Sequence, residues 1–158
     1  MSLLGFFQWC EQSGIGDTIR RSSWLFPVIE AIHLLGLGVI GGAVLTVDLR
    51  LLGLGLRRQP TAQIARDAEP WLVGSLLLML ITGSLLFLSE AIKCYYHEAF
   101  WFKMASLFLA LVFTFTIQRK VIMTDESRLR PLWSKVVAVV SVLLWAGVGI
   151  GGRWIGFS

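Results

Sequence analysis

The chain has 158 residues, of which 56% are hydrophobic and 15% are charged, and its formal net charge is +4. This length corresponds to one domain, and because about a quarter of the residues in a soluble domain are charged, the chain has too little charge to cover a soluble surface. Its Lys and Arg residues form short clusters between apolar stretches and do not line one face. That placement excludes a nucleic-acid interface and favours contact with lipid headgroups.

The first 22 residues predict a segment that lies at the surface of a membrane. They mix large apolar side chains such as Phe6 and Trp9 with the polar Gln8 and Glu11. A basic start followed by a continuous apolar core marks a cleavable signal peptide, and both features are missing here. We therefore expect an amphipathic helix in the headgroup region, and expect the first true span to act as the insertion signal.

Four later stretches are long and apolar enough to cross a bilayer, which takes about 20 helical residues for about 30 Å of hydrocarbon. They are apolar throughout and do not alternate with polar residues, which favours helices over barrel strands. The sequence therefore predicts an all-α protein, a single integral membrane domain over residues 1–158 with four transmembrane helices in a bundle. The expected spans cover roughly residues 24–47, 71–88, 100–117 and 136–150.

Tryptophan and proline mark the expected ends of these spans. An amphipathic indole ring suits the headgroup zone, whereas Trp145 falls inside the fourth span and is expected to pack between helices. Pro70 predicts the start of the second span, because a proline in the first turn of a helix costs no hydrogen bond. The tryptophans near expected span ends are Trp24, Trp71, Trp101, Trp133 and Trp154.

The positions of the basic residues predict the orientation of the chain. Nine of the Lys and Arg residues flank the loops that follow the first and third spans, and five lie on the opposite side. Cytoplasmic loops carry the excess of Lys and Arg. Both termini are therefore expected to face away from the cytoplasm, which in a bacterial inner membrane means the periplasm.

Glu30 and His33 are ionisable residues inside the first expected span, three residues apart and so on nearly the same helix face. His33 would lie roughly 13 Å deep, where an ionisable group without a partner costs on the order of 3 kcal/mol. This face is therefore expected to point into the bundle. His33 is either the axial ligand of a b-type haem or a neutral packing histidine, and spacing alone leaves both open.

Lys103 lies about one turn inside the third expected span, on the same side of the membrane as Glu30. Its ammonium group would either extend to the headgroups or form an ion pair with Glu30, which would neutralise both charges. His97, the second histidine, falls in the short outer loop, so a haem ligated by two histidines is not expected.

Small residues and cysteines give further expectations. Two Gly-x-x-x-Gly pairs, Gly38 with Gly42 and Gly147 with Gly151, predict close approach of the first and fourth spans. Cys10 and Cys94 would both lie on the oxidising side of the membrane, which would permit a disulfide between them. A metal site on Cys94 and His97 is a weaker alternative. No nucleophile–base pair, phosphate-binding loop or zinc motif is present in the sequence.

Several of these runs resemble an uncharacterised bacterial family of four-helix membrane proteins. They extend from Trp24 to Gly36, with its Glu-x-x-His element, from Val47 to Gly53, with Asp-Leu-Arg-Leu-Leu-Gly, and from Ala99 to Met104. The layout is more distantly similar to the copper-resistance D-type and HemJ-type protoporphyrinogen oxidase membrane proteins, which place a His in the first helix and a Lys near the start of a later one. This resemblance implies a haem protein in which His33 and Lys103 are the matching positions. The chain departs from the oxidases in lacking further histidines, with Gln118 where one would be expected, so the resemblance implies haem binding more than oxidase activity.

The sequence thus predicts a small inner-membrane protein that binds haem b or is linked to redox chemistry, with His33, Glu30 and Lys103 as cofactor-binding residues and His33 on the iron. The alternative is a non-catalytic accessory subunit that packs against a larger membrane complex. A transporter or channel protomer is a third reading, for which four short helices offer a pathway only as a homo-oligomer. The bilayer is the expected partner in every case.

Overall fold

The computed structural model describes residues 2–55, 58–124 and 130–155, and the regular elements of these residues are all helical. Four helices are long and apolar enough to cross a membrane, which confirms the predicted fold class. The first two are α3 (Leu25–Leu52) and α4 (Thr61–Ser89), and the fourth is α8 (Pro131–Ile155). The third is continuous from Glu98 to Met123 and consists of α6 (Glu98–Phe113), the π-helical turn η1 (Thr114–Gln118) and α7 (Arg119–Met123).

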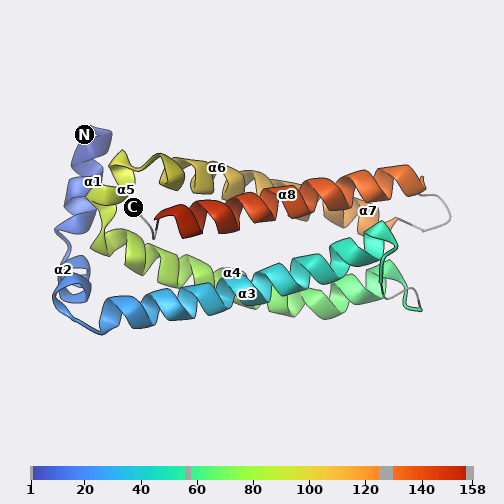
Figure 1. Ribbon diagram of the computed structural model, residues 1–158, viewed down its shortest axis with the longest axis horizontal. Coiled ribbons are helices and arrows are strands. Elements are labelled where there is room, and N and C mark those ends of the chain that lie inside the picture. Colours follow the sequence, from blue (N-terminus) through green and yellow to red (C-terminus); the bar gives the residue numbers. More distant parts are fainter. Residues whose placement is uncertain (1, 56–57, 125–129, 156–158) are drawn as a thin grey trace.

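The long helices alternate in direction and form two antiparallel pairs (Figure 1). α3 packs along α4, α6 packs along α8, and contacts between α3 and α8 join the pairs. Both chain termini lie at one end of the bundle, here called the terminal end. The opposite end, where α3 connects to α4 and the third helix connects to α8, is called the loop end.

The helices extend past the expected spans because residues such as Gly53 and Pro60, and not the edge of the apolar stretch, determine where they begin and end. α3 continues to Gly53, whose φ of 75° forms a left-handed C-cap, a conformation that costs glycine little. α4 begins after Pro60, so the expectation that it starts at Pro70 is wrong. Pro70 is exposed inside α4, where its missing N–H leaves one carbonyl of the preceding turn without its helical donor.

The N-terminal segment forms two short helices and not the single one expected. α1 (Leu3–Glu11) ends before Ser13, whose hydroxyl accepts from the Gly16 N–H and caps α2 (Gly14–Arg21). The two helices lie across the terminal end (Figure 1), where α1 packs on α5 (Ala91–Tyr96) and α2 packs on α4. Together α1 and α2 are called the N-terminal arm.

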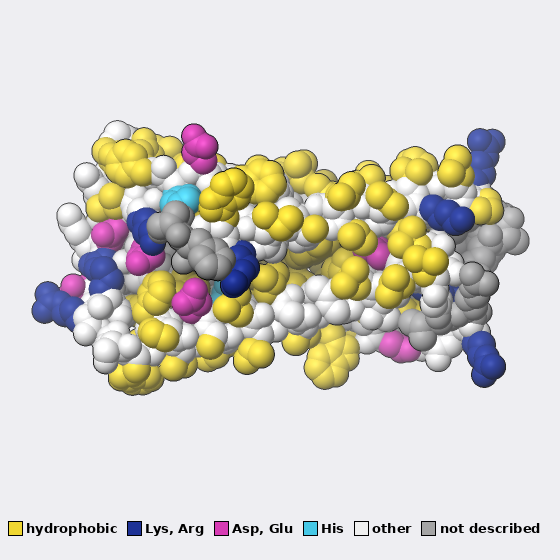
Figure 2. All heavy atoms as spheres, viewed as in Figure 1, with side chains coloured by type: hydrophobic (Ala, Val, Ile, Leu, Met, Phe, Trp, Pro, Cys, Tyr) yellow, Lys and Arg dark blue, Asp and Glu magenta, His cyan; other side chains and the backbone are white. Residues whose placement is uncertain are grey.

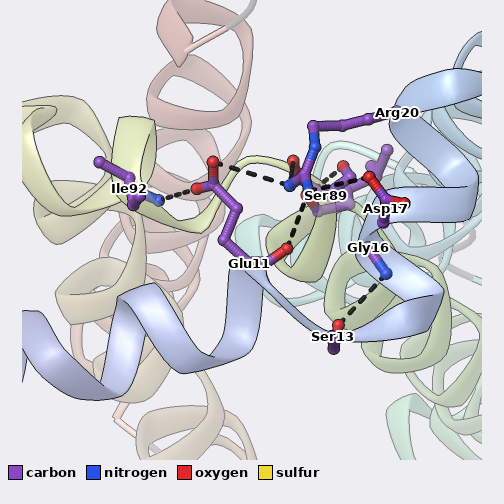
Figure 3. A network of polar contacts seen from close by, with 8 residues as sticks. Glu11, Ser13, Gly16, Asp17, Arg20, Ser89 and Ile92 are labelled. Atoms are coloured by element: carbon purple, nitrogen blue, oxygen red, sulfur yellow. Dashed lines mark hydrogen bonds and ion pairs between the residues drawn. The ribbon is translucent and has the colours of Figure 1, made fainter.

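Polar contacts fasten this arm to the end of α4 and the start of α5 (Figure 3). Arg20 donates to the carbonyl oxygens of Ser89 and Glu11, at 3.0 and 2.9 Å. The Glu11 carboxylate accepts from the Ile92 N–H in the first turn of α5, where a negative charge also favours the helix dipole. The arm is therefore held by bonds between parts of the chain that are far apart in sequence.

The surface agrees with a membrane protein. Apolar side chains cover the face between the two ends, and Lys and Arg gather near the ends (Figure 2). The tryptophans expected at span ends are exposed, whereas Trp145 is 7% exposed and belongs to a central apolar cluster with Ile40, Val44 and Val148, as predicted. A second apolar cluster, which includes Val47, Ile122 and Val137, fills the loop end.

The expected glycine contact between the first and fourth spans is wrong. A Cβ built on Gly38 or Gly42 would meet no atom within 4 Å, so these residues face away from tight contacts. On α8, a Cβ on Gly147 would lie 3.1 Å from Ser106 Oγ, and one on Gly151 would lie 3.1 Å from Lys103 Cβ. The close approach of α8 is therefore to α6, because small residues permit contact with whichever helix the bundle places opposite them.

Candidate functional site

His33 is buried in the terminal half of the bundle and is held by Thr82 of α4. Its Nδ1 lies 2.8 Å from Thr82 Oγ1. The Thr82 hydroxyl donates its own hydrogen to the Leu78 carbonyl one turn earlier, at 2.7 Å. With the Thr82 hydrogen on the Leu78 carbonyl, Oγ1 accepts from the Nδ1-protonated tautomer of His33, which leaves a free lone pair on Nε2. A second hydrogen bond that fixes the tautomer in this way is typical of histidines that bind a metal through the other nitrogen.

Two adjoining cavities, of about 240 and 290 Å³, border His33. The smaller lies toward the terminal end and is bordered by Glu30, His33 and Lys103, so the structure brings the three sequence-predicted residues to one cavity. The larger lies between α4 and α6, with Trp145 of α8 among its walls. The residues that border both are His33, Met79, Gly83, Phe87, Phe100, Lys103 and Val148.

Gly83 provides the room for the imidazole ring. A Cβ at this position would lie 3.2 Å from His33 Cε1, which is tighter than an ordinary carbon–carbon contact. Any larger residue would press on the ring or on the Thr82 hydrogen bond beside it. α4 thus supplies both the acceptor that orients His33 and the space that it occupies.

Glu30 and Lys103 share the smaller cavity but do not form an ion pair; among the described residues, none of the ion pairs includes either of them. The Lys103 side chain lies along α8 instead: a Cβ built on Gly152 would be 3.5 Å from Lys103 Nζ. Because Gly151 and Gly152 of α8 have no side chains, the aliphatic part of Lys103 can pack against them. Lys103 therefore places its ammonium group at the border of the cavity and away from the Glu30 carboxylate.

Cys10 and Cys94 lie in one apolar cluster with Phe7 and Ala91 at the terminal end. Both cysteines are buried free thiols, so the structure brings them together without the disulfide that the sequence would permit. Burial, with a further contribution from the Glu90 carboxylate, raises the pKa of the Cys94 thiol to about 11. Within the described part of the chain, no three His, Cys, Asp or Glu side chains are grouped to hold a metal ion, which leaves the Cys94–His97 metal site without support.

The sequence did not reveal a second group of buried polar residues, near the loop end. Asp48 of α3 is fully buried and accepts a hydrogen bond of 2.8 Å from the Gln118 amide of η1. Ser141 of α8 lies beside the same carboxyl group and is also fully buried. The one available signal was an aspartate directly after a long apolar run; Gln118 and Ser141 are ordinary residues for a membrane helix.

The fold and these sites define a polytopic helical membrane protein with ionisable groups buried in its interior. The chain belongs to a family of unknown function (DUF6644), whose model matches residues 6–158, which confirms the resemblance to an uncharacterised family. No curated protein and no solved structure matches the chain. The likeness to copper-resistance D-type and HemJ-type proteins stays a prediction.

Proposed function

We propose that the chain is a redox-linked membrane protein that binds haem b, with His33 as the axial ligand of the iron and Glu30 and Lys103 in the same site. The observation that carries this proposal is the hydrogen bond from His33 Nδ1 to Thr82. It leaves Nε2 free for a metal and holds the ring in one orientation. A histidine that served only for packing would gain nothing from a free nitrogen at the border of two cavities.

The residues around His33 fit a b-type haem in their chemistry. A neutral imidazole is a common haem ligand, and Phe87, Phe100 and Val148 provide apolar walls on both cavities. Lys103 provides a cation that can pair with an anionic group of the cofactor. The bound haem would supply one-electron chemistry, while the protein supplies ligation, burial and electrostatics.

Each residue of the site then has a separate task. Thr82 keeps the His33 hydrogen on Nδ1, so that Nε2 presents its lone pair. Lys103 adds positive charge near the ligand, and Glu30 adds a carboxylate nearer the terminal end. The central apolar cluster beneath His33 keeps water from the deeper part of the bundle. As part of this proposal, the protein lies in a bacterial inner membrane with both termini, and hence the site, on the periplasmic side.

The visible spectrum of the purified protein tests the proposal. Protein from haem-sufficient cells should show a Soret band that His33→Ala abolishes. His97→Ala is the matched control, because His97 borders neither cavity around His33, and it should leave the band unchanged. A wild-type protein that stays colourless, takes up no added haem and co-purifies with other membrane subunits would contradict the proposal and support an accessory role.

A second variant tests the orienting hydrogen bond. Thr82→Val removes the acceptor with little change of shape and should weaken haem binding about 10–100-fold, as is typical of partners that orient a metal ligand. Thr46→Val is the control, since Thr46 makes the same type of bond to the carbonyl one turn earlier, in α3, and among the described residues bonds to no other helix. Equal haem affinities for both variants would contradict the assigned tautomer.

A further inference from the structure

Three polar side chains from three helices meet in the loop-end half of the bundle, away from the His33 site. Asp48 and Ser141 are 0% exposed and Gln118 is 3% exposed. Gln118 Nε2 donates to Asp48 Oδ1 at 2.8 Å, and Ser141 Oγ lies beside the same carboxyl group. This group borders neither cavity around His33, and Gln118 lines a separate small cavity of about 70 Å³ together with Glu69 and Arg119.

The hydrogen-bonding pattern of this group is incomplete. Asp48 Oδ2, Gln118 Oε1 and Ser141 Oγ are buried and have no partner within the described residues. The carboxylate oxygens and the amide oxygen can only accept hydrogen bonds, whereas the Ser141 hydroxyl can either donate or accept one. A proton on Asp48 Oδ2 turns this oxygen into a donor, for which Ser141 Oγ is an acceptor, and removes the charge of the buried carboxylate.

The Asp48 carboxyl group also has no cation beside it. Among the described residues, no Lys, Arg or His forms an ion pair with it, and a buried charge without a counter-charge is strongly unfavourable. Glu69 of α4 and Arg119 of α7, which line a small cavity together with Gln118, pair with each other at 3.6 Å and are about half exposed. The other charged residues on the surrounding helices at this end are Arg50, Arg66, Asp67, Lys120 and Lys135, and most of their side chains are exposed.

The wide turn of the third helix builds this group. Ala110 is buried, and in a regular α-helix the residue two turns later, Ile117, would also face inward. The π-helical turn adds one residue to this interval. Gln118 is therefore buried in place of Ile117, which is exposed. Other helices hold both ends of the turn: Trp145 Nε1 donates to Thr114 Oγ1 at 3.2 Å, and Gln118 is bonded to Asp48. π-helical turns occur frequently at functional sites, and here the turn places the Gln118 amide where it donates to Asp48.

We propose that Asp48, Gln118 and Ser141 form a proton-binding site in the interior of the membrane. Asp48 carries a proton on Oδ2 at neutral pH and donates it to Ser141 Oγ, while its Oδ1 accepts from the Gln118 amide. The site is independent of haem binding, since it shares no residue with either cavity around His33.

Infrared spectroscopy of the purified wild-type protein at pH 7, about three pH units above the ordinary pKa of Asp, tests this proposal. A protonated carboxylic acid has a carbonyl stretching band that a carboxylate lacks. Labelling the side-chain carboxyl carbon of aspartate with ¹³C should shift this band, while the bands of glutamate stay in place. This measurement needs no variant and therefore does not depend on whether a substitution folds.

Two variants assign the band to its residue. Asp48→Asn should remove it, whereas Asp67→Asn should leave it, because Asp67 is exposed and accepts from Gln63. Ser141→Ala should shift the band to higher frequency, as expected when the acid loses its acceptor. The absence of a label-sensitive acid band at this pH would overturn the proposal, and so would a band that persists in Asp48→Asn.

Discussion

The Cys94 thiol lies in the apolar cluster at the terminal end, and its reactivity follows from that environment. Only the thiolate reacts rapidly with alkylating reagents, and burial raises the pKa of Cys94 to about 11. In a Cys10→Ser variant, alkylation of Cys94 at pH 8 should therefore be slower than that of free cysteine by a factor of about 100 or more. The rate, measured with a maleimide in detergent, should rise as the pH approaches 11.

The same shift has a defined effect on stability. The folded pKa lies above the unfolded value of about 8.5, so the folded state favours the neutral thiol. The resulting stabilisation is fully present below pH 8.5 and is lost as the pH rises through about 11.

The SDS-denatured Cys10→Ser variant is the control for the alkylation measurement and should react as fast as free cysteine. Equally fast reaction of the folded variant at pH 8 would show that the thiol is accessible and unshifted.

At the level of residues, the sequence could identify side chains that are out of place in an apolar stretch, and His33, Glu30 and Lys103 do border one cavity. It could not identify their partners. Thr82 is an ordinary residue in a membrane helix until His33 lies opposite it on another helix. Of the two arrangements that the sequence left open for Lys103, the ion pair with Glu30 does not form, because depth along a helix does not fix the direction of a long side chain.

At the level of elements, the docking of α2 depends on the absence of a side chain at Gly16. A Cβ there would fall inside contact distance of the Leu88 carbonyl of α4, and backbone atoms cannot move aside as a side chain can. Gly16→Ala should therefore destabilise the docked arm by about 1–3 kcal/mol, the usual cost of overpacking. Protease cleavage after Arg20 and Arg21 in detergent should become faster.

Gly14→Ala is the matched control for this prediction. Gly14 lies in the same helix, and a Cβ there would meet no atom within 4 Å, so the change gives the higher helix propensity of alanine without a clash. The protease should cleave the Gly14→Ala variant no faster than the wild type. Equal behaviour of the two variants would show that α2 does not pack on α4 in this way.

Helix existence could be predicted from the apolar stretches, but helix ends and irregularities could not. Pro70 was a reasonable first-turn residue by its type, yet Pro60 also precedes an amphipathic stretch, and the helix starts at the earlier one. The π-helical turn has no sequence pattern of its own. Trp145 and Asp48, on neighbouring helices, bond to its two ends, and the sequence does not show that these residues lie next to it.

At the level of the whole molecule, the structure places both termini at one end, and the excess of basic residues at the loop end predicts the orientation. In a background without Cys10 and Cys94, cysteines introduced at Gln59 and Thr124 should resist an impermeant thiol reagent in intact cells. A cysteine introduced at Ser13 should react. All three should react after permeabilisation, which is the control for accessibility. Labelling of the loop-end positions in intact cells would show that the orientation is the opposite of the predicted one.

The N-terminal arm also constrains the order in which the chain assembles. Glu11 bonds to Ile92, and Arg20 bonds to Ser89, so the arm can dock only after the second span has been synthesised and inserted. During that interval Phe7 and Ile19, both buried in the final structure, have no protein surface to cover them. The membrane surface can hold an amphipathic segment in the meantime. Docking of the arm across the terminal end of the bundle is therefore a late step of biogenesis that waits for the first pair of spans to be complete.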